Sequence, residues 1–311
     1  MTVLLPADDG VAETVARRLP HAEIVEFGRK DRDELGDVTF YCLPYMGDAA
    51  SVELIAGLPR LEVVQSLSSG VENVLPLTPP GVTLCNGRGL HHEESTAELA
   101  VALMLASCRS FDVFFEQQQR REWRHVRTDT LAGKRVLLVG YGRVGQEIEQ
   151  RLLPFGAHVS RVSRTARAGI APLDQLPELA RAADILTVCI ALTDETRAIV
   201  DAHVLASLPD GALVVNVARG PVVDNDALLD ELQKGRLRAA LDVTDPEPLP
   251  PARSEWELAY VLITPHIGGD TFEFGRRAAS FVADQVERHL NNEELVNVVR
   301  TPRDDGGETN P

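Results

Sequence analysis

The sequence predicts an α/β protein in which one doubly wound, parallel-sheet domain lies inside a second domain. Two series of short apolar runs alternate with helical segments, and this rhythm is typical of βαβ units. The second series supplies six candidate strands, as many as a doubly wound sheet of two βαβαβ halves needs. A helix and a strand-like segment follow it. A discontinuous first domain that the C-terminal segment completes explains these leftover elements.

In the first series, each apolar run lies near a Gly, Pro or Asp residue that ends it. The predicted strands are Val3–Leu5, Ile24–Phe27, Val38–Leu43, Leu61–Leu67 and Val82–Cys85, and the predicted helices are Val11–Leu19 and Ala49–Ala56. A long helix is expected next. Ser95 is its predicted cap, with Glu98 three residues on, and its apolar positions extend towards Phe115.

The second series begins after a polar stretch, residues 117–127. Its predicted strands are Val136–Val139, Val159–Val162, Ile185–Ile190, Leu213–Val217, Ala239–Val243 and Val261–Ile263, and helical segments such as Val144–Leu153 and Ala227–Gln233 separate them. A last helix, 275–290, precedes the strand-like segment 295–299, and the tail from residue 301 is expected to be disordered. We therefore place the first domain in residues 1–94 and 282–311, and the inserted domain in residues 95–281.

The composition excludes several classes of partner. The chain has 311 residues, 44% of them hydrophobic and 25% charged, with a formal net charge of -16. Such a charge gives no overall positive field to attract nucleic acid or an anionic membrane surface. The four cysteines, Cys42, Cys85, Cys108 and Cys189, form no CxxC pair and are expected to be free thiols, and we expect no metal site. Since the first ten residues also lack a basic start, we expect a cytoplasmic enzyme or binding protein.

A glycine-rich motif, Gly140-Tyr141-Gly142-Arg143-Val144-Gly145, directly follows the apolar run 135–139 and opens a predicted helix. In this context the first glycine makes a tight turn, the second lets the main chain approach a pyrophosphate, and the third allows the helix to pack closely on the strand. The helix N-terminus offers N–H groups to the phosphates. The motif predicts a dinucleotide-binding loop, and the alternative is a turn that binds no ligand.

The strand after this motif ends without the acidic residue that holds the ribose hydroxyls of NAD. No Asp or Glu lies between Glu149 and Asp174, and the strand end is Ser163-Arg164-Thr165-Ala166-Arg167. Guanidinium groups suit the charge of a 2′-phosphate. We therefore predict that NADP(H) is preferred over NAD(H), with Ser163, Arg164 and Thr165 as contacts. The alternative is that these arginines only solvate a loop.

Three later segments bring an Arg, a Glu and a His just behind predicted strands, where open α/β sheets bind ligands. They are Asn216–Asp224 with Arg219, the Asp245-Pro246-Glu247-Pro248 loop, and Thr264–Gly269 with His266. Singly, each has an ordinary structural explanation. Together they supply what the reduction of a 2-keto acid needs, namely a cation for its oxygens, a proton donor that titrates near neutral pH, and a carboxylate that keeps the donor protonated.

Taken in order, these segments resemble the D-isomer-specific 2-hydroxyacid dehydrogenase family, and most closely its glyoxylate/hydroxypyruvate reductases. The resemblance covers nearly the whole chain and includes Ser69-Gly70-Val71, Ala97-Glu98 and Leu192-Thr193-Asp194-Glu195-Thr196. It implies that Arg219 binds the substrate, that His266 is the acid/base, and that Glu247 pairs with His266. It also implies that the N–H groups of Ser69 and Gly70 hold the substrate carboxylate.

The resemblance further implies a flavodoxin-like substrate domain formed from both chain ends, and a homodimer through the dinucleotide-binding domain. Asp242 is expected beside the nicotinamide carboxamide. The full set of expected cofactor contacts is Gly140, Gly142, Arg143, Val144, Gly145, Ser163, Arg164, Thr165, Cys189, Thr196, Val217, Asp242 and His266. Two residues depart from the family pattern, because Glu72 replaces an Asp and Ala191 replaces a Pro.

We therefore expect an NADP-preferring reductase of small 2-keto acids, with glyoxylate and hydroxypyruvate as first candidates. One alternative is an NAD-dependent D-lactate-like or phosphoglycerate dehydrogenase. Another is a dinucleotide-sensing interaction protein similar to the corepressors that share this fold. Tyr45 is a candidate for the substrate pocket, although a packing role explains it equally well. Trp123 is expected to anchor the fold, and the alternative is that it reaches an active site across a dimer.

Overall fold

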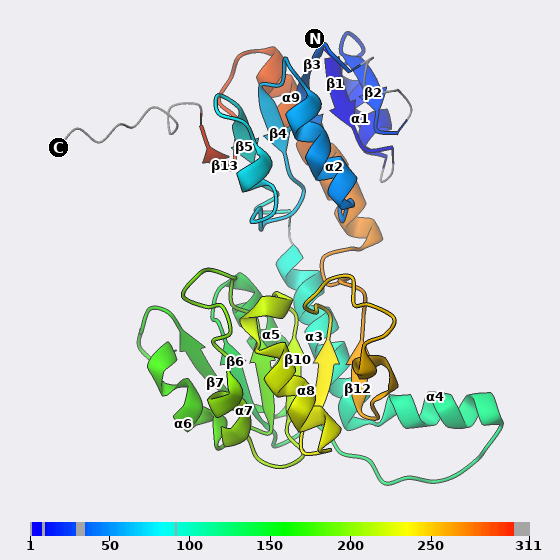
Figure 1. Cartoon of the computed structure of the whole chain (residues 1–311), viewed down its shortest axis with the longest axis vertical. Coiled ribbons are helices and arrows are strands. Elements are labelled where there is room, and N and C mark those ends of the chain that lie inside the picture. The colour runs from blue at the N-terminus through cyan, green and yellow to red at the C-terminus, as the bar shows by residue number, and fades with distance from the viewer. Residues whose placement is uncertain (1, 8–9, 29–34, 91, 302–311) are drawn as a thin grey trace. The chain divides into compact units, whose positions relative to one another are not determined.

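The chain is described by a computed structural model that covers residues 2–7, 10–28, 35–90 and 92–301, and it forms two compact units (Figure 1). Unit 1 comprises residues 1–91 and 271–311, and unit 2 comprises residues 92–270. The second boundary lies at Thr271 and not at residue 282, because the helix that begins at Phe272 belongs to unit 1 from its first turn. The tail predicted to be disordered lies, from residue 302, outside the described residues.

Unit 1 is built on one mostly parallel sheet. Its elements are β1 (Thr2–Leu5), α1 (Val11–Arg18), β2 (Glu23–Glu26), β3 (Val38–Cys42), α2 (Ala49–Glu53), η2 (Leu54–Gly57), β4 (Val63–Gln65), η3 (Leu75–Leu77), β5 (Thr83–Cys85), α9 (Phe272–Leu290) and β13 (Val298–Arg300). Within the described residues the strand order is β13-β5-β4-β3-β1-β2, and β13 is antiparallel to β5. The order 2-1-3-4-5 of the parallel strands is that of flavodoxin-like folds. The expected flavodoxin-like fold is confirmed.

Successive residues of a strand point to opposite faces of the sheet. The apolar side chains of the strands in unit 1 therefore belong to two cores, one on each face. Val3, Leu5 and Phe40 pack with α1 and α9 on one face. Leu4 and Tyr41 pack with α2 and η2 on the other face. The helix α9 contributes a row of buried side chains to the first core, consisting of Phe274, Ala278, Ala279, Val282, Ala283 and Val286.

Unit 2 is a doubly wound sheet. Its elements are α3 (His92–Cys108), α4 (Phe111–Arg120), β6 (Arg135–Val139), α5 (Arg143–Leu152), η4 (Leu153–Phe155), β7 (His158–Ser163), β8 (Ala171–Pro172), η5 (Leu173–Gln175), α6 (Leu176–Ala180), β9 (Ile185–Val188), α7 (Ala202–Ser207), β10 (Leu213–Asn216), η6 (Gly220–Val222), α8 (Asn225–Gln233), β11 (Arg238–Leu241), η7 (Ser254–Glu257) and β12 (Val261–Ile263). Within the described residues all strand pairs are parallel, in the order β12-β11-β10-β9-β6-β7-β8. Counted from β6, this is the Rossmann order 3-2-1-4-5-6 with β12 added. The predicted Rossmann-type fold is confirmed.

Helices cover both faces of the sheet in unit 2 (Figure 1). One core joins α3 and α5 to the sheet through side chains such as Met104 and Ile148. The opposite core joins α6, α7 and α8 through Leu176, Leu205 and Leu228. At the start of the sheet, Asp184 accepts hydrogen bonds from the Arg135 main-chain N–H at 2.8 Å and from its guanidinium Nε and Nη2 at 3.1 and 2.8 Å. This pair joins the first residue of β6 to the residue that precedes β9.

The long helix expected from Ser95 to Phe115 is wrong at its start and in its middle. Helix α3 already includes His92, and Ser95 lies inside it, where its hydroxyl donates to the His92 carbonyl at 3.2 Å. Ser110 adopts a left-handed conformation with φ of 52°, which interrupts the helix and starts α4. Helix α4 extends to Arg120, into the polar stretch 117–127, and projects from the body of unit 2 (Figure 1).

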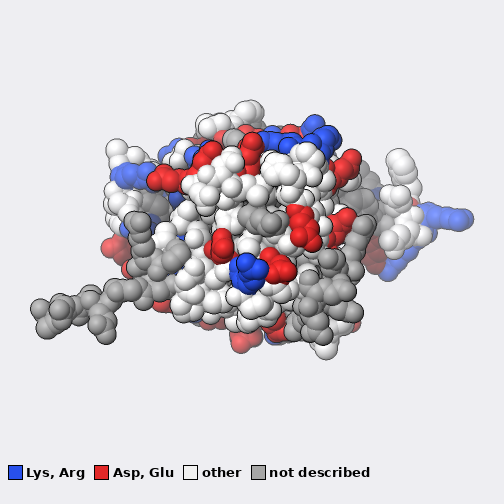
Figure 2. Space-filling view, turned by 90° about the horizontal axis from the view of Figure 1, so that it is seen from above, with Lys and Arg blue, Asp and Glu red and all other residues white. Residues whose placement is uncertain are grey.

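The surface carries charges of both signs. On the face drawn in Figure 2, acidic and basic side chains are interspersed among uncharged ones. Within the described residues, none of the helices has both the length and the apolar character that crossing a membrane requires.

Candidate active site

The predicted site residues of unit 2 follow the carboxyl ends of parallel strands, and these ends meet at one edge of the sheet. Gly140 follows β6, Ser163 ends β7, Cys189 follows β9, and Arg219, Asp242 and His266 come after β10, β11 and β12. The sheet therefore brings these predicted residues to one edge.

The glycines of the 140–145 motif, which we call the fingerprint loop, differ in what surrounds them. Gly140 has φ of 104°, and a Cβ there would lie 2.6 Å from the Ile190 nitrogen. A Cβ on Gly145 would lie 2.6 Å from the Gly140 oxygen. Gly142 has no neighbouring atom within 4 Å of such a Cβ, so a glycine there leaves open space in front of the first turn of α5. Open space beside the unpaired N–H groups of a helix N-terminus fits the pyrophosphate of a dinucleotide.

Cys189 supports the fingerprint loop. Its thiol donates a hydrogen bond to the Gly140 carbonyl at 3.0 Å. Desolvation raises the pKa of the Cys189 thiol to about 12, so that the thiol keeps the proton it donates. Thr196 and Val217, two other expected cofactor contacts, have buried side chains. The Thr196 hydroxyl donates to the Ala191 carbonyl at 2.7 Å, which makes it a support of the 191–196 loop.

At the end of β7, the predicted cofactor contacts have different surroundings. The Ser163 hydroxyl is buried and donates to the Thr165 carbonyl at 2.7 Å, so it shapes the turn instead of offering a free donor. Arg164 is exposed, and its Nη1 lies 3.8 Å from Oε2 of Glu195, which is also exposed. Among these contacts, Arg164 has the side chain best placed to meet a phosphate from solvent.

Glu247 and His266 are in direct contact. Nδ1 of His266 lies 2.5 Å from Oε1 of Glu247, and the exposed fractions of the two side chains are 20% and 36%. His266 has φ of 55° and lies between Pro265 and Ile267, where its N–H donates to the Asp242 carbonyl at 2.8 Å. The predicted pairing of this His and this Glu is therefore present. With Nδ1 facing a carboxylate, Nε2 is the ring nitrogen available to a substrate.

Asp242 holds the segment around His266 from the neighbouring strand. Its buried carboxylate accepts hydrogen bonds from the Thr264 hydroxyl at 2.6 Å and from the N–H groups of Ile267 and Gly268, both at 2.9 Å. All three donors come from the residues that flank His266. Asp242 was expected beside the cofactor. Its supporting role was not predicted and follows from the pairing of Leu241 with Ile263 in the sheet.

The segment that carries Arg219 is shaped by two residues that the sequence analysis did not single out. The Asn216 amide donates to the Arg219 carbonyl and its oxygen accepts from Ala218 N–H, both at 3.0 Å. Gly220 lies against the main chain of Thr244, and a Cβ at this position would lie 1.9 Å from the Thr244 oxygen. The Arg219 and Glu247 loops are therefore in main-chain contact.

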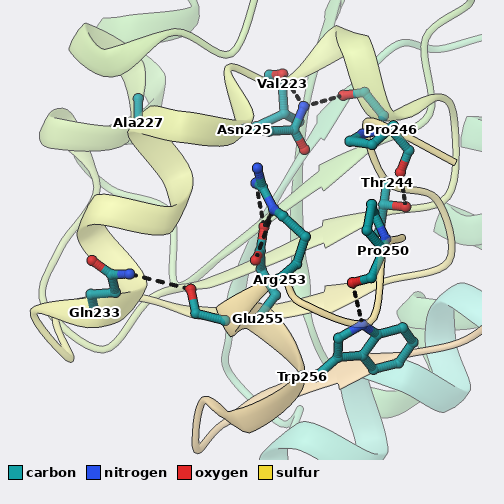
Figure 3. Close-up of polar contacts among 12 residues, drawn as sticks. Val223, Asn225, Ala227, Gln233, Thr244, Pro246, Pro250, Arg253, Glu255 and Trp256 are labelled. Carbon is teal, nitrogen blue, oxygen red and sulfur yellow. Dashed lines mark hydrogen bonds and ion pairs between the residues drawn. The ribbon is translucent and has the colours of Figure 1, made fainter. Parts of the chain in front are cut away.

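The segment 244–256, which includes Glu247, is held together by polar contacts among its own residues (Figure 3). The Thr244 hydroxyl donates to the Pro246 carbonyl at 2.8 Å. Further along, the buried Glu255 carboxylate accepts hydrogen bonds from Arg253 Nη2 at 2.6 Å and Nε at 3.0 Å, and Trp256 Nε1 donates to the Pro250 carbonyl at 3.1 Å. These contacts hold together the segment that carries Glu247, and two of them involve residues of η7.

In unit 1, the loop with Ser69 and Gly70 follows β4. The Asn86 amide donates to the Ser69 carbonyl at 3.0 Å, and Gly87 N–H donates to the Ser68 carbonyl at 2.8 Å. A Cβ on Gly87 would lie 2.0 Å from the Leu67 oxygen, so this close approach requires glycine. Asn86 and Gly87 were not singled out from the sequence, although they determine the shape of this loop.

Tyr45 and Trp123 are the two aromatic residues for which roles were expected. The Tyr45 ring packs on Phe274, with 4.3 Å between ring centroids, which is the packing role foreseen as its alternative. Trp123 is fully exposed, so the expectation that it anchors the fold is wrong.

Residues 101–268 match the model of a protein family described as D-isomer specific 2-hydroxyacid dehydrogenase, NAD binding domain. A D-3-phosphoglycerate dehydrogenase from Mycobacterium tuberculosis is 34% identical over 94% of this chain. The chain spans 58% of the length of that relative. A glyoxylate/hydroxypyruvate reductase A from Arabidopsis thaliana is 32% identical, over 80% of this chain and 82% of the relative.

The chain is also similar to solved structures of dehydrogenases and reductases. A D-isomer specific 2-hydroxyacid dehydrogenase from Xanthobacter autotrophicus Py2, in complex with NADPH and MES, is similar with a TM-score of 0.74, 27% identity, and coverage of 98% of this chain and 99% of the other. An NADPH-dependent glyoxylate/hydroxypyruvate reductase from Sinorhizobium meliloti, in complex with NADP and malonate, is similar with a TM-score of 0.79, 26% identity and coverage of 96% of each chain.

Proposed function

The chain belongs to the D-isomer specific 2-hydroxyacid dehydrogenase family, and from this membership we propose that it reduces small 2-keto acids with NADPH. Glyoxylate and hydroxypyruvate are the first candidate substrates. The observation that carries the proposal is the 2.5 Å contact between His266 and Glu247 at the sheet edge that also bears the fingerprint loop. In this proposal His266 is a proton donor held by a carboxylate, at the edge where open α/β sheets bind their ligands.

Each side chain of the proposed site has a separate task. When bound, the dinucleotide supplies a hydride to the carbonyl carbon of the keto acid. His266 gives a proton from Nε2 to the carbonyl oxygen, while Glu247 orients the ring through Nδ1. Arg219 stabilises the negative charge that develops on this oxygen. In unit 1, the N–H groups of Ser69 and Gly70 are suited to hold the substrate carboxylate.

The preference for NADP(H) is supported by the end of β7. There is no Asp or Glu between Glu149 and Asp174, so no carboxylate in this segment repels a 2′-phosphate. Arg164 is exposed at this end of the strand and is suited to pair with the phosphate. The NADPH dependence of the similar Sinorhizobium meliloti reductase agrees with this choice.

The first experiment is a screen of purified protein with NADPH and a dozen 2-keto acids, followed by the same screen with NADH. We expect the highest kcat/KM for NADPH with glyoxylate or hydroxypyruvate. A second candidate function, NAD-dependent oxidation of 3-phosphoglycerate, is favoured by the 34% identity to the phosphoglycerate dehydrogenases. Turnover of 3-phosphoglycerate with NAD, without reduction of glyoxylate by NADPH, would replace the first proposal by the second. Dinucleotide binding without any turnover would favour a sensing role instead.

We also propose that two copies associate through unit 2. Helix α4 carries Phe111 and Phe115, which are 46% and 60% exposed and lie edge to face, and Trp123 follows it fully exposed. Neighbouring exposed aromatic side chains are typical of protein contact surfaces. Light scattering should give the mass of a dimer for the wild type and that of a monomer for Phe115→Glu.

The four free cysteines are in keeping with a reducing, cytoplasmic location.

A further inference from the structure

The side chain of Tyr141, inside the fingerprint loop, contacts a buried carboxylate in α5. Its hydroxyl donates a hydrogen bond to Oε2 of Glu149, whose exposed fraction is 5%. The same oxygen accepts a hydrogen bond from Nε of Arg161 at 2.8 Å, and the other oxygen pairs with Nη2 of Arg161. The Arg161 guanidinium also lies over the Tyr141 ring, 5.4 Å from its centroid. Because a buried carboxylate is stable only when paired, these three side chains keep one another in place.

The main chain around Tyr141 connects this cluster to the end of β7. Gly140 N–H donates to the Val162 carbonyl at 2.8 Å, directly before Ser163. Nη2 of Arg167, in the turn that follows β7, donates to the Tyr141 carbonyl at 3.4 Å. Arg167 and Arg164 are the two arginines of this turn. Tyr141 therefore contacts both α5 through its side chain and the arginine-bearing turn through its carbonyl.

From these contacts we infer that Tyr141 is a positioning residue that couples the fingerprint loop to the 163–167 turn, and so controls how strongly NADP(H) is preferred over NAD(H). The side chain determines where the Tyr141 carbonyl lies, and the carbonyl determines where Arg167 lies. A shift of Tyr141 moves the pyrophosphate loop and one arginine of the 2′-phosphate site together. The inference rests on the proposed function, because it takes these two segments to bind NADP(H).

The test is the affinity of the whole chain for NADPH and for NADH, measured by fluorescence titration without a keto acid. Tyr141→Phe removes only the hydroxyl. We expect its Kd to rise about tenfold for NADPH and about threefold for NADH, in the range of one lost hydrogen bond. Tyr141→Leu also removes the ring beside Arg161, and its loss of NADPH affinity should be larger. In Tyr141→Phe, the KM for the keto acid at saturating NADPH should stay within about a factor of two, because the substrate does not use this cluster.

A matched control is Tyr41→Phe, which removes a buried tyrosine hydroxyl that donates to the Ser51 carbonyl at 2.9 Å in unit 1. It should lower the unfolding temperature and leave both Kd values unchanged. Glu149→Gln combined with Tyr141→Phe should weaken NADPH binding by less than the product of the single effects, because both substitutions remove one shared contact.

Unchanged Kd values in Tyr141→Phe, or equal increases for NADPH and NADH, would overturn the inference. The titrations use no keto acid. If the Tyr141 variants show the expected changes in Kd but the wild type reduces no 2-keto acid, the proposed function is contradicted and the inference about Tyr141 is not.

Discussion

Gly220 lies so close to the Thr244 carbonyl that a Cβ at position 220 would be 1.9 Å from its oxygen. This contact joins the segment that presents Arg219 to the loop that presents Glu247. The two side chains come from different strand ends, and main-chain packing sets the spacing of the loops that carry them. The following predictions test this site and its surroundings.

Gly220→Ala should separate the two loops. Because the clash is with main chain, which cannot turn aside like a side chain, we expect a lower unfolding temperature and a fall in kcat of about tenfold or more. Gly57→Ala is the control, since a Cβ at Gly57 meets nothing within 4 Å and its φ is not positive. Equal kcat values for Gly220→Ala and the wild type would show that this contact does not position the site.

The pH dependence of the reaction should report on His266. Reduction requires the protonated imidazole, and oxidation of the hydroxy acid requires the neutral one. We therefore expect kcat/KM for reduction to fall as the pH rises, and kcat/KM for oxidation to rise over the same range. His266→Asn should remove both trends and lower the rate by at least about a hundredfold. A His266→Asn variant with the wild-type pH profile would end its assignment as acid/base.

Arg219→Lys should distinguish the effect of the positive charge at position 219 from the effect of the guanidinium geometry. An ammonium keeps the positive charge but loses the planar, two-pronged donor set of the guanidinium. We expect kcat/KM for the keto acid to fall about a hundredfold, equivalent to about 2.7 kcal/mol, with the Kd of NADPH nearly unchanged. A loss of NADPH affinity with an unchanged KM for the keto acid would instead make Arg219 a cofactor residue.

The choice of cofactor should depend on Arg164. Arg164→Ala should raise the KM for NADPH at least about tenfold and leave that for NADH nearly unchanged, because only NADPH carries the 2′-phosphate. Ser163→Asp should go further and favour NADH, by placing a carboxylate at the end of β7. Glu195→Gln is the opposite control, since it removes the carboxylate 3.8 Å from Arg164 and should lower the KM for NADPH. Steady-state rates with both cofactors are sufficient to measure these KM values. A wild type that uses NADH better than NADPH contradicts this assignment.

The pair of Asp184 with Arg135 should make stability depend on pH. Hydrogen bonds from the Arg135 guanidinium and N–H lower the pKa of the Asp184 carboxyl below its ordinary value, against a smaller opposite effect of burial. Its stabilising contribution is therefore present above the unfolded-state pKa and is lost as the pH falls through the lower folded-state pKa. Asp184→Asn should unfold at a lower temperature than the wild type at pH 7, and this difference should shrink below about pH 4.

The exposed Asp174→Asn is the control for this prediction and should match the wild type at both pH values. A difference between Asp184→Asn and the wild type that is independent of pH would show that the amide changes packing and not charge.

Local sequence patterns predicted the strands well and the loops less well. Runs such as 135–139 are apolar and follow clear breakers, whereas β8 consists only of Ala171 and Pro172 and has too few residues to show a pattern. Ser95 looked like a helix cap, but the helix already includes His92, and tertiary packing of its apolar face overrides one cap signal.

In the candidate site, too, residues that follow strands could be predicted from the sequence, whereas residues that support the loops could not. Arg219, Glu247 and His266 could be proposed because each follows a strand and each has a chemistry that the reaction needs. The supporting roles of Asn216 and Asp242 depend on neighbouring loops, which no spacing along the chain displays. The buried position of Ser163 likewise follows from its bond to the Thr165 carbonyl, two residues away, and not from its residue type.

The insertion of unit 2 also has a consequence for synthesis on the ribosome. The apolar face formed by Val3, Leu5 and Phe40 is covered by α9, whose residues are translated only after the whole of unit 2. Unit 2 is therefore the first unit with all its residues available, although unit 1 begins the chain. Until then, only α1 covers this face of the first strands, and the part that α9 covers stays exposed, the kind of surface to which chaperones bind.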